Sequence, residues 1–222
     1  MSEQLINYLE GFVTEERATL FNNILKERTR YITVVLEDIF QPHNASAVLR
    51  SCDCFGVQDV HIIENQNEYT VNNEVSMGSH KWLSLQKYNS EEGNTLKAIQ
   101  NLKNKGYRVV ATTPHTNNVE LHNFDLSKGK CAFLFGTELR GLSETAIENA
   151  DEYLKIPMYG FTESFNISVS AAIILYQLKL KLLQSGINWQ LSEKDKQCIH
   201  KEWLITSIKD GENIAKNFLQ SL

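Results

Sequence analysis

Short runs of β-branched and other apolar residues alternate with segments of helical spacing over residues 31–183, and this alternation restricts the fold more than any other feature. The predicted strands are 32–36, 60–63, 107–112, 132–135 and 153–156. The predicted helices are 44–55, 92–105, 143–149 and a long one over 166–183, with a surface loop at 65–77. Strands that alternate with helices indicate an α/β fold, a parallel sheet covered by helices on both faces.

The two ends of the chain have helical rather than strand-like patterns. Thr14 is placed to cap a helix whose apolar stripe includes Phe21 and Leu25. The C-terminal part contains Trp203 and Phe218 as packing residues in a segment of mixed charge. We therefore predict helical extensions at 1–30 and 186–222 around a core at 31–185.

Composition limits the class of protein. A chain of 222 residues with 42% hydrophobic content is expected to form one moderately large core. No apolar run reaches membrane-spanning length, and the first residues lack the basic and apolar regions of a secretory signal. We expect a cytoplasmic protein without a membrane partner. The net charge of −5 argues against indiscriminate coating of nucleic acid, so any RNA contact must be local.

The four cysteines, Cys52, Cys54, Cys131 and Cys198, do not form a disulfide framework in a chain of this length. The Cys-x-Cys spacing at 52–54 is not that of a zinc ribbon, and no clustered histidines complete a ligand set. Reduced thiols and no metal site are expected.

The first candidate site is the segment 156–172, which connects a predicted strand to a predicted helix. A strand ends there, the chain is interrupted by Pro157 and Gly160, and a helix begins among small polar residues that include Ser164 and Asn166. Unpaired N–H groups at a helix start attract acceptor atoms, and either side chain can cap the helix or reach a ligand. From the residues alone, a ligand site and an ordinary helix cap both remain open.

The second candidate site follows the first predicted strand. Asn44 is placed to cap the next helix, and Arg50 lies almost two turns further on, among apolar residues. An arginine in this position is either a surface group with a packed stem or a cation directed into a cleft.

The third candidate site is a glycine-bounded loop between a strand and a helix, residues 134–143. Gly136 and Gly141 have the spacing of a phosphate-binding loop, but the next residue is Leu142 where such a loop requires lysine. The dinucleotide fingerprint is absent as well. The loop therefore either brings backbone close to a ligand, with the carboxylate of Glu138 inside it, or is a tight turn.

Together these three segments resemble the motif set of the SPOUT class of RNA methyltransferases, in its TrmH branch of 2′-O-ribose methyltransferases. The matching motifs are Pro-His-Asn-x-Ser-Ala-Val-Leu-Arg from Pro42, Leu-Phe-Gly-x-Glu from Leu134 and Ile-Pro-Met-x-Gly-x-x-x-Ser-x-Asn-x-Ser-Val from Ile156. The resemblance extends over about residues 14–183, and it departs from the family only where Phe165 and Ile167 replace the usual leucine and valine.

The resemblance implies a C-terminal trefoil knot, an exception to the rule that chains do not thread loops. It also implies S-adenosylmethionine as cofactor. Carried over residue by residue, the cofactor site would consist of Thr112, Thr113, Phe135, Gly136, Ile156, Met158, Phe165, Asn166 and Ser168.

The same resemblance assigns the activating role to Arg50, with Asn44, Glu138, Ser164 and Asn166 holding it and the ribose in place. Arginine is a poor base, because its pKa lies above about 12. We therefore expect Arg50 to bind the target phosphate and to lower the pKa of the neighbouring hydroxyl, with the proton passing to phosphate or water.

The short helical extensions resemble the family members that methylate guanosine 18 in the D-loop of tRNA. Ribosomal RNA is the alternative substrate, although enzymes of that kind commonly carry a separate N-terminal RNA-binding domain. A non-catalytic RNA-binding module would leave Glu138 and the cofactor loops without a purpose. A different α/β enzyme with a nucleotide cofactor is disfavoured by the two failed phosphate motifs.

The family also implies a homodimer whose cleft is completed by the second subunit. The long motif helix, with Ile173, Ile174 and Tyr176, is expected near the interface unless these residues are buried in the core. For the RNA backbone we predict contacts from Arg28, Arg30 and Lys81.

Overall fold

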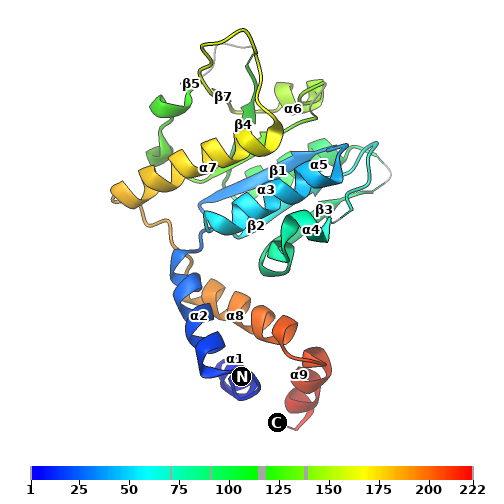
Figure 1. The fold of residues 1–222 in the computed structure, drawn as a ribbon, viewed down its shortest axis with the longest axis vertical. Coiled ribbons are helices and arrows are strands. Elements are labelled where there is room, and N and C mark those ends of the chain that lie inside the picture. The colour runs from blue at the N-terminus through cyan, green and yellow to red at the C-terminus, as the bar shows by residue number, and fades with distance from the viewer. Residues whose placement is uncertain (1, 71, 91, 115–118, 138–139, 222) are drawn as a thin grey trace. The chain divides into compact units, whose positions relative to one another are not determined.

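A computed structural model describes residues 2–70, 72–90, 92–114, 119–137 and 140–221. The chain divides into two compact units (Figure 1). The sheet unit is Arg30–Trp189, and the helical unit combines Met1–Thr29 with Gln190–Leu222. The helical unit thus takes its residues from both ends of the chain.

The sheet unit contains, among its described residues, a seven-stranded sheet in the order β3-β2-β1-β6-β4-β7-β5, with every pair parallel. The strands are β1 (Ile32–Glu37), β2 (Asp59–Ile63), β3 (Ser84–Tyr88), β4 (Arg108–Thr112), β5 (Val119–Glu120), β6 (Cys131–Phe135) and β7 (Glu152–Lys155). All residues of the neighbouring strands β1 and β6 are buried, which explains why the two strands are mostly apolar.

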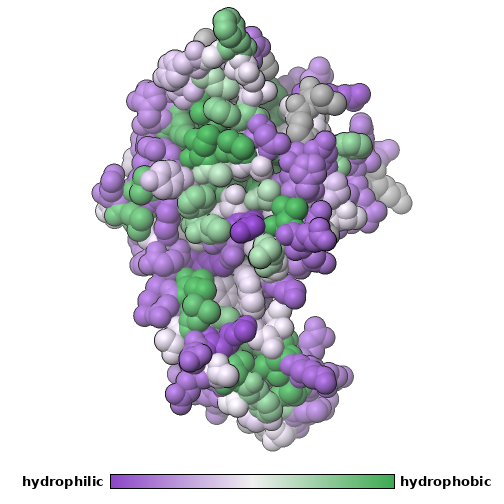
Figure 2. Space-filling model, viewed as in Figure 1, coloured by the Kyte–Doolittle hydropathy of each residue, from purple (hydrophilic) through white to green (hydrophobic). Residues whose placement is uncertain are grey.

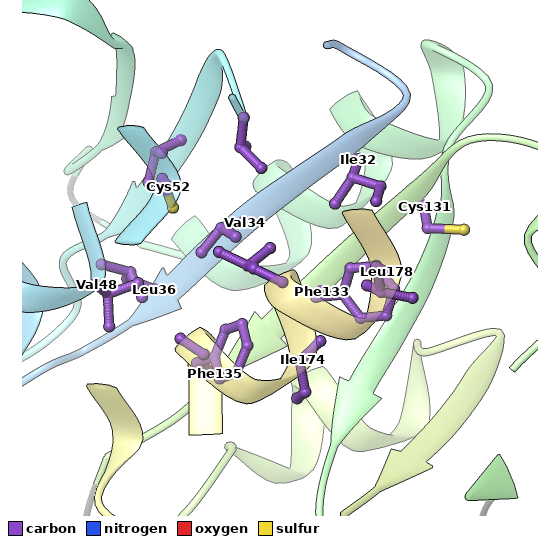
Figure 3. Close-up of a cluster of buried hydrophobic side chains, with 14 of the residues drawn as sticks. Ile32, Val34, Leu36, Val48, Cys52, Cys131, Phe133, Phe135, Ile174 and Leu178 are labelled. Carbon is purple, nitrogen blue, oxygen red and sulfur yellow. The ribbon is translucent and has the colours of Figure 1, made fainter. Parts of the chain in front are cut away.

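Helices cover both faces of this sheet, as predicted. They are α3 (Pro42–Cys54), α4 (Asn73–Ser76), α5 (Asn94–Asn104), α6 (Glu144–Glu148) and α7 (Ile167–Gln184), with 3₁₀ helices η1 (Ser79–Trp82), η2 (Leu121–Asn123) and η3 (Leu126–Lys128). On one face, α3 and α7 pack against Val34 and Phe133 (Figure 3). On the other face, α5 and α6 pack against Val35 and Leu134. Successive residues of one strand thus point to opposite faces.

The five predicted strands and the main helices are confirmed, with ends that shift by one or two residues. Two strands were not predicted, the edge strand β3 and the two-residue β5. The predicted loop at 65–77 contains the short helix α4. The structure corrects the role of Asn44, because α3 begins at Pro42 after the N-cap residue Gln41. Asn44 therefore lies inside the first turn.

We expected no apolar run of membrane-spanning length. Helix α7 corrects this expectation, because by length and composition it could cross a membrane. One face of α7 nevertheless belongs to the core of the sheet unit. Ile174, Leu175, Leu178 and Leu182 are at most 1% exposed there. Burial against the sheet accounts for the apolar composition of this face of α7.

The helical unit contains α1 (Ser2–Glu10), α2 (Glu15–Glu27), α8 (Glu193–Ser207) and α9 (Gly211–Gln220). The rings of Phe21 on α2 and Trp203 on α8 meet edge to face at 5.5 Å between centroids. Thr14 accepts a hydrogen bond from the backbone N–H of Arg17, which confirms the predicted cap of α2. All four cysteines are free thiols, and no cluster of three potential metal ligands occurs in the described part of the chain.

Candidate active site

A cavity of about 550 Å³ opens at the carboxyl ends of β4, β6 and β7. Its walls are residues 136–137 and 140–142 of the loop 136–142, the segment 156–165 and the start of α7. Ligands of parallel sheets gather at this edge, and small-molecule sites span roughly 300–1,000 Å³. The lining includes eight residues that were predicted for the cofactor or catalytic site, namely Thr112, Thr113, Phe135, Gly136, Ile156, Met158, Ser164 and Phe165.

Two predicted cofactor residues, Asn166 and Ser168, shape the wall of the cavity without lining it. The side-chain oxygen of Asn166 accepts hydrogen bonds from the backbone N–H of Ser168 at 2.8 Å and from its hydroxyl at 2.7 Å. Asn166 is therefore the N-cap of α7. The two interpretations of this segment are compatible, because a capped helix start forms part of a cavity wall.

The neck of the loop 136–142 is closed by backbone hydrogen bonds. Thr137 and Gly141 exchange two backbone hydrogen bonds, of 2.9 and 3.0 Å, across the neck of the loop. A Cβ atom on Gly136 would lie 2.2 Å from the backbone carbon and oxygen of Gly141, so only glycine fits. Gly141 has φ +70°, a conformation that glycine adopts without strain. The glycine spacing thus has a steric cause that is unrelated to phosphate binding.

Several lining residues were not predicted. They are Pro114, Thr137, Arg140, Gly141, Leu142, Ile147, Leu154, Lys155, Glu163, Ile167, Ser170 and Ile174. For Ile167, Ser170 and Ile174 a signal was present, since spacings of three and four residues place them on one side of α7. Thr112 is placed as expected, but its hydroxyl donates to the carbonyl of Leu134 at 2.6 Å within the sheet.

The cavity offers charged groups, serine and threonine hydroxyls and apolar surface. Arg140, Lys155 and Glu163 are its titratable groups, and no histidine, cysteine or aspartate lines it among the described residues. Apolar side chains form much of the remaining wall. Such a site is suited to holding two reactants in alignment, which alone lowers a barrier substantially.

The predicted catalytic residues lie at different places around α3 and α7. Asn44 is 2% exposed, and its side-chain oxygen accepts from the Asn166 amide at 3.2 Å, which joins the two helices. Arg50 is exposed on α3 and does not line the cavity of its own chain. Glu138 lies outside the described residues. The geometry thus brings Asn44 and Asn166 together and leaves Arg50 apart from them.

Of the three predicted RNA contacts, Arg28 is corrected by the structure. Its side chain is 2% exposed, and its guanidinium lies 5.1 Å from the centre of the Trp203 ring. A cation that is buried on an aromatic face cannot reach a phosphate. Arg30 pairs with Asp59 at 3.0 Å and is 30% exposed, so part of its charge is neutralised. Lys81 is exposed on η1.

Comparison with known proteins shows the family to which the chain belongs. Residues 31–176 match the SpoU rRNA Methylase family. The chain belongs to this family, in agreement with the resemblance seen in its motifs. A tRNA (guanosine(18)-2′-O)-methyltransferase from Borreliella burgdorferi is 42% identical over 216 residues, which cover 97% of this chain and 96% of that relative. The enzyme of the same name from Thermus thermophilus is 37% identical, over 78% of this chain and 87% of its own.

Solved structures agree with this assignment. The A. aeolicus TrmH/SpoU tRNA modifying enzyme has a TM-score of 0.77 and 31% identity, and the match covers 88% of this chain and 98% of that one. The SpoU methyltransferase AviRb from Streptomyces viridochromogenes, in complex with the cofactor AdoMet, has a TM-score of 0.60 at 22% identity, covering 73% of this chain and 62% of that one. At that identity the second comparison shows a shared fold.

Proposed function

We propose that this protein transfers a methyl group from S-adenosylmethionine to the ribose 2′-oxygen of guanosine 18 in tRNA. The observation that carries the proposal is the 42% identity to a tRNA (guanosine(18)-2′-O)-methyltransferase over 97% of the chain. That match includes both helical segments as well as the sheet unit. Ribosomal RNA remains the alternative substrate, because the family model that matches the sheet unit describes rRNA methylases.

The cavity suits S-adenosylmethionine. Phe135, Ile156 and Met158 would provide apolar surface for the base and for the carbon groups around the sulfonium. The carboxylate of Glu163 and the hydroxyl of Ser170 would accept hydrogen bonds from the ligand's ammonium and ribose hydroxyl groups. When bound, this group supplies a methyl carbon activated by positive charge on sulfur.

The protein must then align the ribose and stabilise charge as its hydroxyl loses a proton. Arg50 would bind the phosphate beside the target ribose, and its fixed positive charge would favour the developing negative charge on the 2′-oxygen. The proton would leave to phosphate or water. Asn44, Ser164 and Asn166 would orient the reacting groups, together with Glu138.

A twofold-symmetric homodimer is part of this proposal. Three apolar residues of α7 share one side at a spacing of seven residues and are 43–54% exposed, namely Val169, Tyr176 and Leu183. Figure 2 shows apolar side chains gathered along the α7 side of the sheet unit. Ile174, by contrast, is buried in the core. A second copy on this face would also bring another Arg50 toward the cleft, which fits the absence of Arg50 from the lining of its own chain's cavity. Sedimentation that shows a fully active monomer would overturn the dimer.

Two further parts of the proposal come from the family. One is a trefoil knot formed by the last strands and α7, which would explain why the loop 136–142 and the segment 156–165 wall a single cavity. The other is a cytoplasmic location, where tRNA is modified.

The function is tested in two steps. Calorimetry measures binding of S-adenosylmethionine, which a non-catalytic RNA-binding module does not require. Methyl transfer is then followed on an undermodified tRNA, on the same tRNA with a 2′-deoxyguanosine at position 18, and on ribosomal RNA. We expect transfer to the first substrate and none to the second. Transfer to ribosomal RNA with none to tRNA would replace the proposed substrate by its alternative.

A further inference from the structure

Glu37 is a buried carboxylate at the last position of β1, beside the strand that leads into the cavity loop. Glu37 is 2% exposed, and its carboxylate accepts three hydrogen bonds. The Thr95 hydroxyl on α5 donates at 2.6 Å, the Ser143 hydroxyl at 2.7 Å and the Ser143 backbone N–H at 2.9 Å. Two of these three bonds therefore come from Ser143, the residue that follows the loop 136–142.

The three groups that contact the Glu37 carboxylate all donate to it. The Ser143 hydroxyl already accepts from the backbone N–H of Ala146, and the Thr95 hydroxyl accepts from the side-chain amide of Asn65. A hydroxyl has one proton, so both protons are directed to Glu37. A glutamine at position 37 would present an amide group to donors that need an acceptor. The site therefore requires a carboxylate rather than any polar side chain of that size.

The loop 136–142 is consequently fixed at three points. At its entry, Phe135 pairs with Leu36 in the sheet, next to Glu37. At its neck, Thr137 and Gly141 exchange two backbone hydrogen bonds. At its exit, Ser143 is bound to Glu37. The same Ser143 hydroxyl caps α6, so the exit anchor also sets where that helix begins.

We infer that Glu37 is a positioning residue that holds the described loop residues, 136–137 and 140–142, in the arrangement that walls the ligand cavity. Glu37 itself does not line the cavity, and it acts through Ser143. The inference rests on the proposed function only for the identity of the ligand. In the protein without ligand, the carboxylate of Glu37 on the neighbouring strand already holds Ser143 at the exit of the loop.

The variants distinguish two roles of the Ser143 hydroxyl, its hydrogen bond to Glu37 and its capping of α6. Ser143→Ala removes the hydroxyl that donates to Glu37 and, at the same time, the cap of α6. Ser192→Ala is the matched control, because Ser192 caps α8 in the helical unit through a hydrogen bond of the same length, 3.1 Å. Thr95→Val removes the other hydroxyl on Glu37 without touching the loop. Ser143→Thr restores the hydroxyl, and Glu37→Gln removes the acceptor itself.

Hydrogen exchange is measured on the full-length protein without ligand, at the amides of Thr137 and Gly141. We expect Glu37→Gln and Ser143→Ala to raise these exchange rates about tenfold or more, a size typical of losing a hydrogen bond to a charged group. Ser143→Thr, Thr95→Val and Ser192→Ala should stay near the wild-type rates. Unchanged exchange in Glu37→Gln and Ser143→Ala, or an equal rise in Ser192→Ala, would overturn the inference.

Binding of S-adenosylmethionine is the second measurement. We expect its Kd and KM to rise about tenfold in Glu37→Gln and Ser143→Ala, with kcat at saturating ligand near that of the wild type. Loss of kcat at unchanged KM would overturn the positioning role. A wild-type protein that fails to bind S-adenosylmethionine would contradict the proposed function, whereas the exchange measurement would still decide the role of Glu37.

Discussion

The side-chain amide of Asn166 donates to the side-chain oxygen of Asn44 at 3.2 Å, which links the start of α7 to the first turn of α3. The oxygen of the same Asn166 side chain accepts from Ser168 and caps α7. Asn44 in turn donates to the side-chain oxygen of Gln41, the N-cap residue of α3. One asparagine therefore performs two separable tasks, a capping task through its oxygen and a linking task through its nitrogen.

Asn166→Ser should separate these tasks. A serine hydroxyl can still cap α7, but it is too short to reach Asn44. We expect stability close to that of the wild type in urea denaturation, together with a tenfold or greater loss of methyl transfer. Asn166→Ala should lose both functions and about 1 kcal/mol of stability. Equal activity of the serine variant and the wild type would show that the link to Asn44 has no role in the reaction.

Arg50→Ala should abolish methyl transfer while leaving S-adenosylmethionine binding and folding nearly intact. The physical reason is that Arg50 is exposed and does not line the cavity of its own chain, so neither the core nor the cavity depends on it. Arg50→Lys keeps the charge but loses the planar two-point contact to phosphate, and should remain well below wild-type activity. Near-normal turnover of the alanine variant would eliminate the proposed mechanism.

Gly136→Ala should disrupt the cavity directly. The added Cβ would lie 2.2 Å from the backbone of Gly141, so the loop must open. We expect undetectable S-adenosylmethionine binding in calorimetry and a loss of stability on the order of 1–3 kcal/mol, as for overpacked sites. The matched control is Gly160→Ala in the neighbouring segment, where a Cβ meets nothing within 4 Å. Similar binding losses in both variants would refute the steric explanation.

Substitution of Arg28 should change the stability of the protein, whereas substitution of Lys81 should change the salt dependence of tRNA binding. Arg28→Ala should destabilise the helical unit by about 1 kcal/mol, because its guanidinium packs on Trp203. Lys81→Ala should leave stability unchanged and reduce the slope of log tRNA affinity against log salt by about 1, if Lys81 contacts one phosphate. Arg30→Ala should change that slope less than Lys81→Ala, since Asp59 already neutralises part of its charge. An unchanged slope for Lys81→Ala would place the RNA on another face.

Stability should decrease in mild acid because of His61, a buried residue of β2. Burial, followed by the nearby Lys105 charge, lowers the pKa of His61 from 6.5 to about 4. Between these two values the unfolded chain binds a proton that the folded protein does not. The stabilisation is therefore fully present above about pH 6.5 and is lost as pH falls toward 4, by on the order of 3 kcal/mol. His61→Gln should flatten the pH dependence of the unfolding free energy in this window, and an identical slope would contradict the assignment.

The sequence was sufficient for the parallel sheet and for eight of the residues that line the cavity, since both follow from local patterns. The buried central strand β6 is a continuous apolar run, β1 is largely apolar, and the motif residues follow strand ends. The edge strand β3 was missed because Ser84, Gln86 and Lys87 give it a polar, partly exposed sequence without a strand signal. Its pairing with β2 is a tertiary property.

The errors at Arg28 and Asn44 have a common origin. Both residues were assigned from their positions in the chain, one near a helix end and the other ahead of an apolar run. The partners that determine their roles, Trp203 and Asn166, lie more than a hundred residues away. The anchor at Glu37 could not be predicted for the same reason, because Ser143 is 106 residues distant. Side-chain partners at such separations are set by the completed fold.

The helical unit joins α1 and α2 to α8 and α9, so its two halves are separated in the chain by the whole sheet unit. During synthesis, Phe21 and its apolar neighbours emerge from the ribosome long before Trp203 exists to cover them. The apolar residues of the first thirty positions therefore stay uncovered by α8 and α9 until those helices have been synthesised. Removing α8 and α9 would leave that segment with exposed apolar surface, a state prone to aggregation and capture by chaperones.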